Sequence, residues 1–77
     1  MDKETKLDYL DLLSTSNNVY WDEDKYTFDE FQNIIMEAIE KTVKTYTINN
    51  QFIVDDWDMF DSDLVHITNQ LLGNDED

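Results

Sequence analysis

The sequence contains no cysteine, no proline and no arginine, and glycine occurs only once among its 77 residues. Without cysteine there is no disulfide framework, no thiolate nucleophile and no zinc–thiolate site. A single glycine, Gly73, excludes a glycine-rich phosphate-binding loop. No apolar run approaches membrane-spanning length, and the first residues lack the apolar stretch of a signal peptide. We therefore expect a cytoplasmic protein with no membrane partner.

Positive charge is also scarce. Five lysines stand against nineteen carboxylates, which gives a formal net charge of -14. Affinity for nucleic acid comes from lysine and arginine side chains that displace counterions from phosphates, so the sign of the charge argues against a nucleic-acid partner. Solubility needs a net charge of only about 2–8 in magnitude in a small domain. The excess therefore predicts a function, namely the binding of a basic partner.

The hydrophobic pattern predicts one small α+β domain, mostly helical, over residues 1–72, followed by a disordered acidic tail over residues 73–77. Three helices and two short strands are expected in the order helix, strand, helix, strand, helix. The expected helices span residues 3–13, 28–46 and 56–72, and the expected strands are Val19–Trp21 and Gln51–Val54.

Capping signals mark the ends of these helices. Asp2 is the expected N-cap of the first helix, Thr27 and Glu30 form a capping box before the second, and Gly73 is placed to end the third. Asn49 and Asn50 mark a turn.

Apolar residues at helical spacing predict the core. The second helix contributes Phe31, Ile34, Ile35, Ala38, Ile39, Thr42, Val43 and Tyr46, and the third contributes Trp57, Phe60, Leu64, Ile67 and Leu71. Five large side chains remain outside these stripes: Tyr20, Trp21, Tyr26, Phe52 and Met59. Because so small a domain has a thin stability margin, we expect these five to form the seam of a homodimer; a partner-binding anchor flanked by acids is the alternative.

Catalysis is not expected, and neither is a cofactor or a metal site. His66 is the only histidine, and it lies beside the apolar stripe of the third helix. A calcium-binding EF-hand loop starting at Asp22 would place Tyr26 and Thr27 at its fifth and sixth positions, where an oxygen ligand and glycine are needed. A loop starting at Asp61 fails in the same way at Val65.

The acidic residues are clustered, and we predict that they bind the partner. Five carboxylates fall within nine residues at the start of the third helix: Asp55, Asp56, Asp58, Asp61 and Asp63. Asp22, Glu23 and Asp24 form a second patch, and Glu37 and Glu40 a third. Helical neighbours three apart have Cβ atoms about 5–6 Å apart, and Asp22 and Asp24 would be about 6.6 Å apart if extended. These spacings resemble the separation of successive phosphates on a nucleic-acid strand. For a single aspartate near a helix start, capping is the simpler explanation.

In size, net charge and acid clustering, the chain resembles small phage-encoded proteins that mimic DNA and inhibit host DNA-binding proteins. Usage rich in Asn, Asp and Ile, with lysine in place of arginine and without proline, suits an AT-rich phage genome. The resemblance is compositional and implies a basic DNA-binding protein of the bacterial host as partner. Within this group, the chain resembles the staphylococcal-phage inhibitors of the DNA polymerase sliding clamp. HU-type nucleoid proteins, uracil-DNA glycosylase, RNA polymerase and CRISPR nucleases are other targets of the group.

Two other classes of function stay open. An antitoxin or immunity protein would use the same charge to mask a basic nuclease toxin. An adaptor would bind through an apolar face, and its binding would persist at high salt, whereas that of a DNA mimic weakens steeply.

Overall fold

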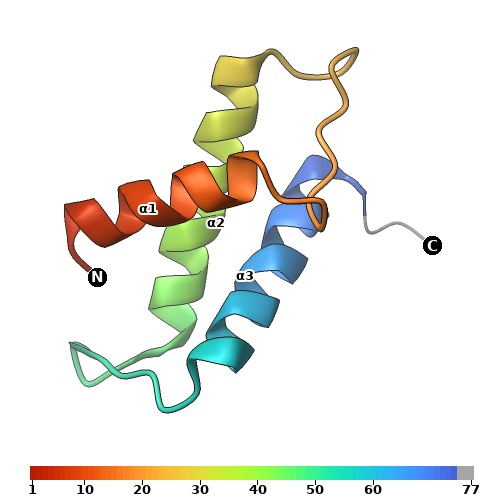
Figure 1. Ribbon diagram of the computed structural model, residues 1–77. Coiled ribbons are helices and arrows are strands. Elements are labelled where there is room, and N and C mark those ends of the chain that lie inside the picture. The colour runs from red at the N-terminus through yellow and green to blue at the C-terminus, as the bar shows by residue number, and fades with distance from the viewer. Residues whose placement is uncertain (75–77) are drawn as a thin grey trace.

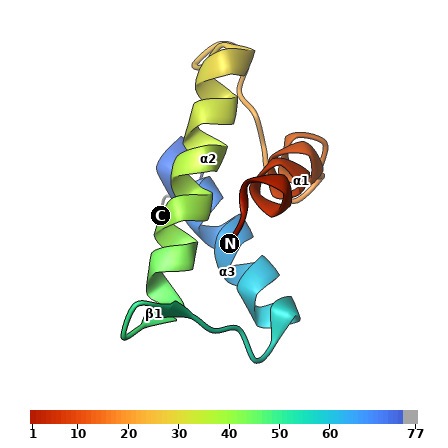
Figure 2. The same ribbon diagram turned by 90° about the vertical axis from the view of Figure 1, so that its left-hand side faces the viewer.

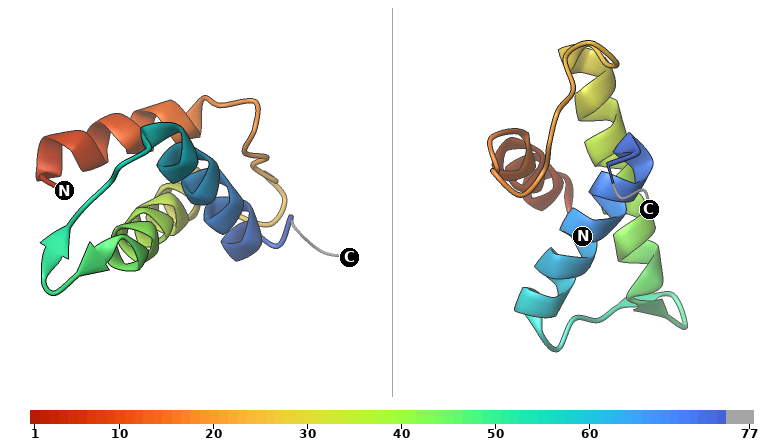
Figure 3. Two further views of the ribbon diagram at one scale, coloured as in Figure 1. Left: turned by 90° about the horizontal axis from the view of Figure 1, so that it is seen from below. Right: turned by 90° about the vertical axis from the view of Figure 1, so that its right-hand side faces the viewer.

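The computed structural model describes residues 1–74 and contains three helices and a short β-hairpin (Figure 1). The helices are α1 (Lys3–Ser14), α2 (Phe28–Thr45) and α3 (Trp57–Leu72), and the hairpin consists of β1 (Thr47–Ile48) and β2 (Gln51–Phe52). α2 and α3 lie side by side and run in opposite directions, and α1 crosses one face of the pair (Figures 1 and 2). The hairpin lies at the opposite end of the molecule from the last turn of α3 (Figure 3). The mostly helical α+β prediction is confirmed.

The helix ends follow the predicted capping signals. Asp2 accepts a hydrogen bond from the backbone N–H of Thr5 at 2.8 Å. The Thr27 hydroxyl oxygen accepts the N–H of Glu30 at 3.2 Å, and the Glu30 carboxylate accepts the N–H of Thr27 at 2.9 Å, which completes the capping box. Gly73 ends α3 at a φ of 79°, a left-handed conformation that glycine adopts without strain. The helix bounds agree with the predicted ones to within one residue.

The predicted turn at Asn49 and Asn50 is confirmed as the loop of the hairpin. A two-residue hairpin loop of the favoured type requires positive φ at both positions. Asn49 has a φ of 52° and Asn50 one of 65°, a conformation that asparagine tolerates better than most residues. Thr47 pairs with Phe52 in an antiparallel register.

The strand predicted at Val19–Trp21 does not form, so the observed order is helix, helix, strand, strand, helix. β2 pairs with β1, which lies just before it, because closing the short asparagine loop has a smaller entropic cost than pairing with a distant segment. Val19 is buried in the core instead, and Trp21 stacks on Phe31 with ring centroids 5.4 Å apart.

The core lies mainly between α2 and α3 and comprises Leu13, Val19, Phe31, Ile35, Ala38, Ile39, Phe60, Leu64 and Leu72. On α3 the predicted stripe is partly wrong. Thr68 and Leu72 are buried, whereas Trp57 is 48% exposed and Ile67 and Leu71 are only half-buried. The buried row repeats every four residues from Phe60, as helix packing through such ridges favours. The Thr68 hydroxyl donates to the Leu64 carbonyl at 2.7 Å, so its burial leaves no unpaired polar atom.

Phe60 is the centre of this core and is fully buried. Four aromatic rings surround it: Tyr9 of α1 at 5.6 Å between centroids, Tyr46 at 5.2 Å, Phe52 of β2 at 5.8 Å and Trp57 at 5.3 Å. Tilted and edge-on contacts of this kind stabilise by about 0.5–1.5 kcal/mol each beyond the buried area. Phe60 therefore joins both other helices and the hairpin to α3.

Three of the five side chains expected in a homodimer seam lie within the body of the single chain. Phe52 packs on Phe60, as described above. The Trp21 indole N–H donates to the Tyr26 carbonyl at 2.9 Å, and the Tyr26 hydroxyl donates to the carbonyl at the end of α3 at 3.4 Å. Tyr20 is 64% exposed and Met59 is 58% exposed. The aromatic excess therefore builds the monomer, and dimerisation stays a prediction.

Of the tail expected over residues 73–77, the structure describes Gly73 and Asn74. Gly73 ends α3, and the Asn74 side chain donates to the Tyr20 carbonyl at 2.7 Å. The rest of the expected tail, residues 75–77, lies outside the described residues. Across residues 1–74, none of the helices combines the length and the apolar character needed to span a membrane.

Replacing Phe60 by alanine should cost about 3–5 kcal/mol of unfolding free energy, because it removes a fully buried ring and leaves a cavity. A domain of this size has a total stability of only about 4–12 kcal/mol, so the variant should be marginal or unfolded. Urea denaturation followed by circular dichroism measures the change, with the exposed neighbour Met59→Ala as control. A Phe60→Ala cost no larger than that of the control would contradict the central role of this ring.

Candidate partner-binding surface

The five carboxylates at the start of α3 do not share one face. Consecutive residues of an α-helix are about 100° apart around its axis, so Asp61 and Asp63 are separated by about 200°. Asp61 contacts Tyr9 of α1, whereas Asp63 contacts Tyr46 at the end of α2. The helix therefore divides the predicted cluster between its two flanks.

Asp58 and Asp61 lie in a groove between α1 and the first half of α3, together with Asp8 of α1. Three adjoining hollows form this groove, and Asp61 lines all of them. The hollow around Asp58 and Asp61 has a volume of about 450 Å³. We call this surface the acidic groove; its lining includes Asp8, Tyr9, Leu12, Asn18, Asp58, Asp61, Ser62 and Val65. No lysine is among the described residues that line it.

The Asp61 carboxylate is held in the acidic groove by Tyr9. The Tyr9 hydroxyl donates a hydrogen bond to Asp61 Oδ1 at 2.6 Å, across 52 positions of sequence. Burial, and secondarily this hydrogen bond, raise the pKa of Tyr9 well above its usual range. A carboxylate has about four lone-pair sites, and Asp61 is only half-buried. It can therefore anchor α1 and still accept a hydrogen bond from a partner.

Asp63 has the equivalent role on the other flank of α3. The Tyr46 hydroxyl donates to Asp63 Oδ2. This hydrogen bond, followed by burial and by the negative charges of Asp63 and Asp56, raises the pKa of Tyr46 to about 12. The Asp63 carboxylate thus fixes α3 against the end of α2, and it lies outside the acidic groove.

Asp55 and Asp56 lie at the hairpin end of the molecule. Asp56 is the N-cap of α3, and its Oδ1 accepts the backbone N–H groups of Asp58 at 3.0 Å and Met59 at 3.3 Å. Both aspartates line a hollow of about 270 Å³ with apolar walls. We call it the hairpin hollow; its lining comprises Thr45, Tyr46, Ile48, Ile53, Asp55, Asp56 and Met59.

The second predicted patch is a turn and not an extended segment. The Asp22 carbonyl accepts the N–H groups of Lys25 and Tyr26, both at 3.1 Å, and its side chain accepts the N–H of Asp24 at 3.0 Å. The phosphate-like spacing predicted for Asp22 and Asp24 required an extended chain and therefore does not apply. Glu23 and Asp24 are exposed.

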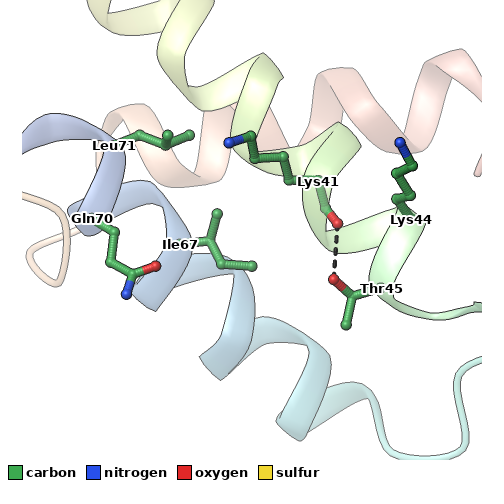
Figure 4. Close-up of a pocket in the computed structure, with 6 residues that line it drawn as sticks. All are labelled: Lys41, Lys44, Thr45, Ile67, Gln70 and Leu71. Carbon is green, nitrogen blue, oxygen red and sulfur yellow. Dashed lines mark hydrogen bonds between the residues drawn. The ribbon is translucent and has the colours of Figure 1, made fainter.

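The third predicted patch, Glu37 and Glu40, lies on the exposed face of α2, one turn before Lys41 and Lys44. The two lysines border a hollow of about 400 Å³ between α2 and α3, which we call the α2–α3 hollow; Thr45, Ile67, Gln70 and Leu71 complete its lining. Figure 4 shows the Lys41 amine reaching toward Leu71 across this hollow. Carboxylate–lysine pairs four apart stabilise a helix by about 0.2–0.5 kcal/mol each, so helix stability is a sufficient role for these glutamates.

Of the predicted acids, the acidic groove therefore contains only Asp58 and Asp61, and it adds Asp8, whereas Asp55 and Asp56 lie together at the hairpin hollow. The position of Asp8 one turn before Leu12 on α1 was visible in the sequence, but the face that α1 turns toward α3 was not. Within residues 1–74, no group of three or more His, Cys, Asp or Glu side chains is arranged to hold a metal ion.

Comparisons with models of protein families, with curated proteins and with solved structures find no match to this chain.

The two tyrosine–aspartate hydrogen bonds predict a loss of stability at high pH. In the unfolded chain tyrosine has a pKa of about 10, and folding raises the pKa of both Tyr9 and Tyr46. The stabilisation is therefore complete below about pH 10 and declines as the pH rises toward 12 and above, where the folded-state phenols ionise. Urea midpoints measured at intervals from pH 8 to 12 should fall more steeply for the wild type than for a Tyr46→Phe variant.

Other groups that titrate in this range do so in both proteins, so the difference between the two curves isolates the phenol. Tyr20→Phe, which removes an exposed hydroxyl, is the matched control and should follow the wild-type curve. Parallel curves for wild type and Tyr46→Phe would contradict the role of the Tyr46–Asp63 hydrogen bond.

Proposed function

We propose that this protein is a phage-type DNA mimic, which binds the basic DNA-binding surface of a host bacterial protein and blocks access of DNA. The DNA polymerase sliding clamp is the best candidate for the target. The acidic groove is the observation that supports this proposal most strongly. It gathers carboxylates from two helices in a hollow surface with no lysine among its described lining residues.

The charge of the whole molecule favours such a partner. A formal charge of -14 on 77 residues produces a negative potential that attracts cationic surfaces and repels DNA. Electrostatic steering of this kind raises association rates and makes them depend on ionic strength. A lysine-lined DNA channel has the complementary charge, and its occupation by the protein would exclude DNA.

The geometry of the acidic groove suits cationic side chains that normally contact phosphates. Asp58 and Asp61 are three residues apart on α3, which places their Cβ atoms about 5–6 Å apart. Leu12, which is 58% exposed, lies beside Asp8 and Asp61 and can contact the aliphatic part of a lysine or arginine. The groove thus combines phosphate-like charge with an apolar contact.

Other partners use the same charge complementarity. A nuclease toxin masked by this chain as an antitoxin or immunity protein is the first alternative. Another DNA-binding target, such as an HU-type nucleoid protein, uracil-DNA glycosylase, RNA polymerase or a CRISPR nuclease, is the second. All of them act in the bacterial cytoplasm, where we place the protein, and none requires catalysis by it.

A homodimer is part of the proposal, and the α2–α3 hollow suits it best. The lysines at its border lie one turn from Glu37 and Glu40, so repulsion between two acidic copies is weaker there than at the acidic groove. Ile67 and Leu71 provide half-buried apolar area. Sedimentation equilibrium at several protein concentrations measures the oligomeric state directly.

Three double variants, each removing two negative charges, test the proposed site. They are Asp8→Asn with Asp58→Asn in the acidic groove, Glu23→Gln with Asp24→Asn in the turn, and Glu37→Gln with Glu40→Gln on α2. Asp61 is retained because it holds Tyr9. With purified sliding clamp, the groove variant should bind about tenfold or more weakly, equal to about 1.4 kcal/mol, and its affinity should depend less on salt.

The turn and α2 variants are the matched controls, since they change the net charge equally. Each should lose clearly less affinity than the groove variant. Equal losses in all three would show that only the total charge matters, and wild-type affinity in the groove variant would refute the assignment of the site. Binding of a nuclease toxin in place of the clamp would favour the immunity-protein alternative.

A further inference from the structure

We propose that the hairpin hollow is a second contact site, which receives an apolar side chain flanked by lysine or arginine on the same basic partner. The inference rests on the proposed function only in taking the partner to be cationic. It assigns a role to a surface that the acidic groove does not include, and it predicts an apolar contribution to binding that salt does not weaken.

The hairpin hollow gathers large apolar side chains that the fold leaves in contact with solvent. Ile48 is 61% exposed, Met59 58% and Ile53 47%. All three line the same hollow, together with Tyr46. Single exposed apolar side chains are common on protein surfaces, but a group of them around a concavity marks a binding site.

The walls of the hairpin hollow are held in place before any partner binds. The Ile53 N–H donates to the Tyr46 carbonyl at 3.0 Å, which fixes the segment after β2 to the end of α2. The Tyr46 hydroxyl is bonded to Asp63, and its ring packs on Phe60. A pre-ordered surface loses less conformational entropy on binding, so its apolar area contributes more to affinity.

The charge around the hairpin hollow selects the occupant. Asp55 and Asp56 line it, and both are exposed. A second copy of this chain would bring the same two carboxylates and would be repelled. A neutral apolar segment would leave them uncompensated at the edge of the contact. An apolar side chain between cationic residues would contact the apolar walls, and its cationic neighbours would pair with the two carboxylates at the edge.

Two synthetic pentapeptides test this inference with the full chain. One has four lysines around a central leucine, and the other has four lysines around a central serine, so their charges are identical. Binding is followed by the backbone and methyl NMR signals of the protein. We expect the leucine peptide to bind about tenfold more tightly, since burial of a leucine side chain favours binding by about that factor. Its additional shifts should be confined to the residues that line the hairpin hollow, with the methyl shifts at Ile48, Ile53 and Met59.

An Ile48→Ser, Ile53→Ser double variant should abolish the difference between the two peptides. Both side chains are exposed, so the fold should be retained, which the NMR spectrum itself reports. Leu7→Ser, which removes a 47% exposed leucine from α1, is the matched control and should keep the difference.

The possible failures are distinguishable. Equal binding of the two peptides, or leucine-specific shifts at residues that do not line the hairpin hollow, would overturn the assignment of this site and leave the acidic groove unaffected. If neither peptide binds at low salt, the cationic partner is refuted, and with it both this inference and the proposed function.

Discussion

Phe60 is fully buried where α1, the end of α2 and the hairpin meet the first half of α3, and four aromatic rings surround it. Two of these rings belong to Tyr9 and Tyr46, whose hydroxyl groups donate hydrogen bonds to Asp61 and Asp63 on the two flanks of α3. The same contacts that bury Phe60 therefore fix the rotation of α3 about its own axis. That rotation decides which carboxylates face α1, and thus the composition of the acidic groove.

The acidic residues have different roles, although composition alone makes them look alike. Asp56 caps α3 and Asp63 accepts the hydrogen bond of Tyr46 at the end of α2, so both stabilise the fold. Asp61 belongs to both categories, because it anchors α1 and also lines the acidic groove. Asp8 and Asp58 lie beside it, and within residues 1–74 their carboxylates hold no second element in place. A protein whose charge opposes its own folding thus uses some of that charge to hold its helices together, and the proposed function assigns the remainder to a partner.

Local signals predicted much of the fold. The caps at Asp2, Thr27 and Gly73 depend on neighbouring residues only, and all three are confirmed. The strand at Val19–Trp21 was predicted wrongly, because strand preferences do not include the low entropic cost of closing the hairpin loop that pairs β2 with β1. Membership of the acidic groove was only partly predictable. Helical spacing predicts that Asp58 and Asp61 are neighbours on one face of α3. The contribution of Asp8 depends on how α1 packs against α3, which the spacing of residues within one helix does not determine.

The most direct test of the proposed function is whether the proposed target, the sliding clamp, can hold DNA and this protein at once. Loading of purified sliding clamp onto nicked circular DNA by its loader, followed by gel filtration, measures this. The account predicts that the protein and DNA exclude one another, and that stoichiometric protein abolishes loading while the acidic-groove double variant does not. Recovery of a complex containing clamp, DNA and this protein together would contradict the account.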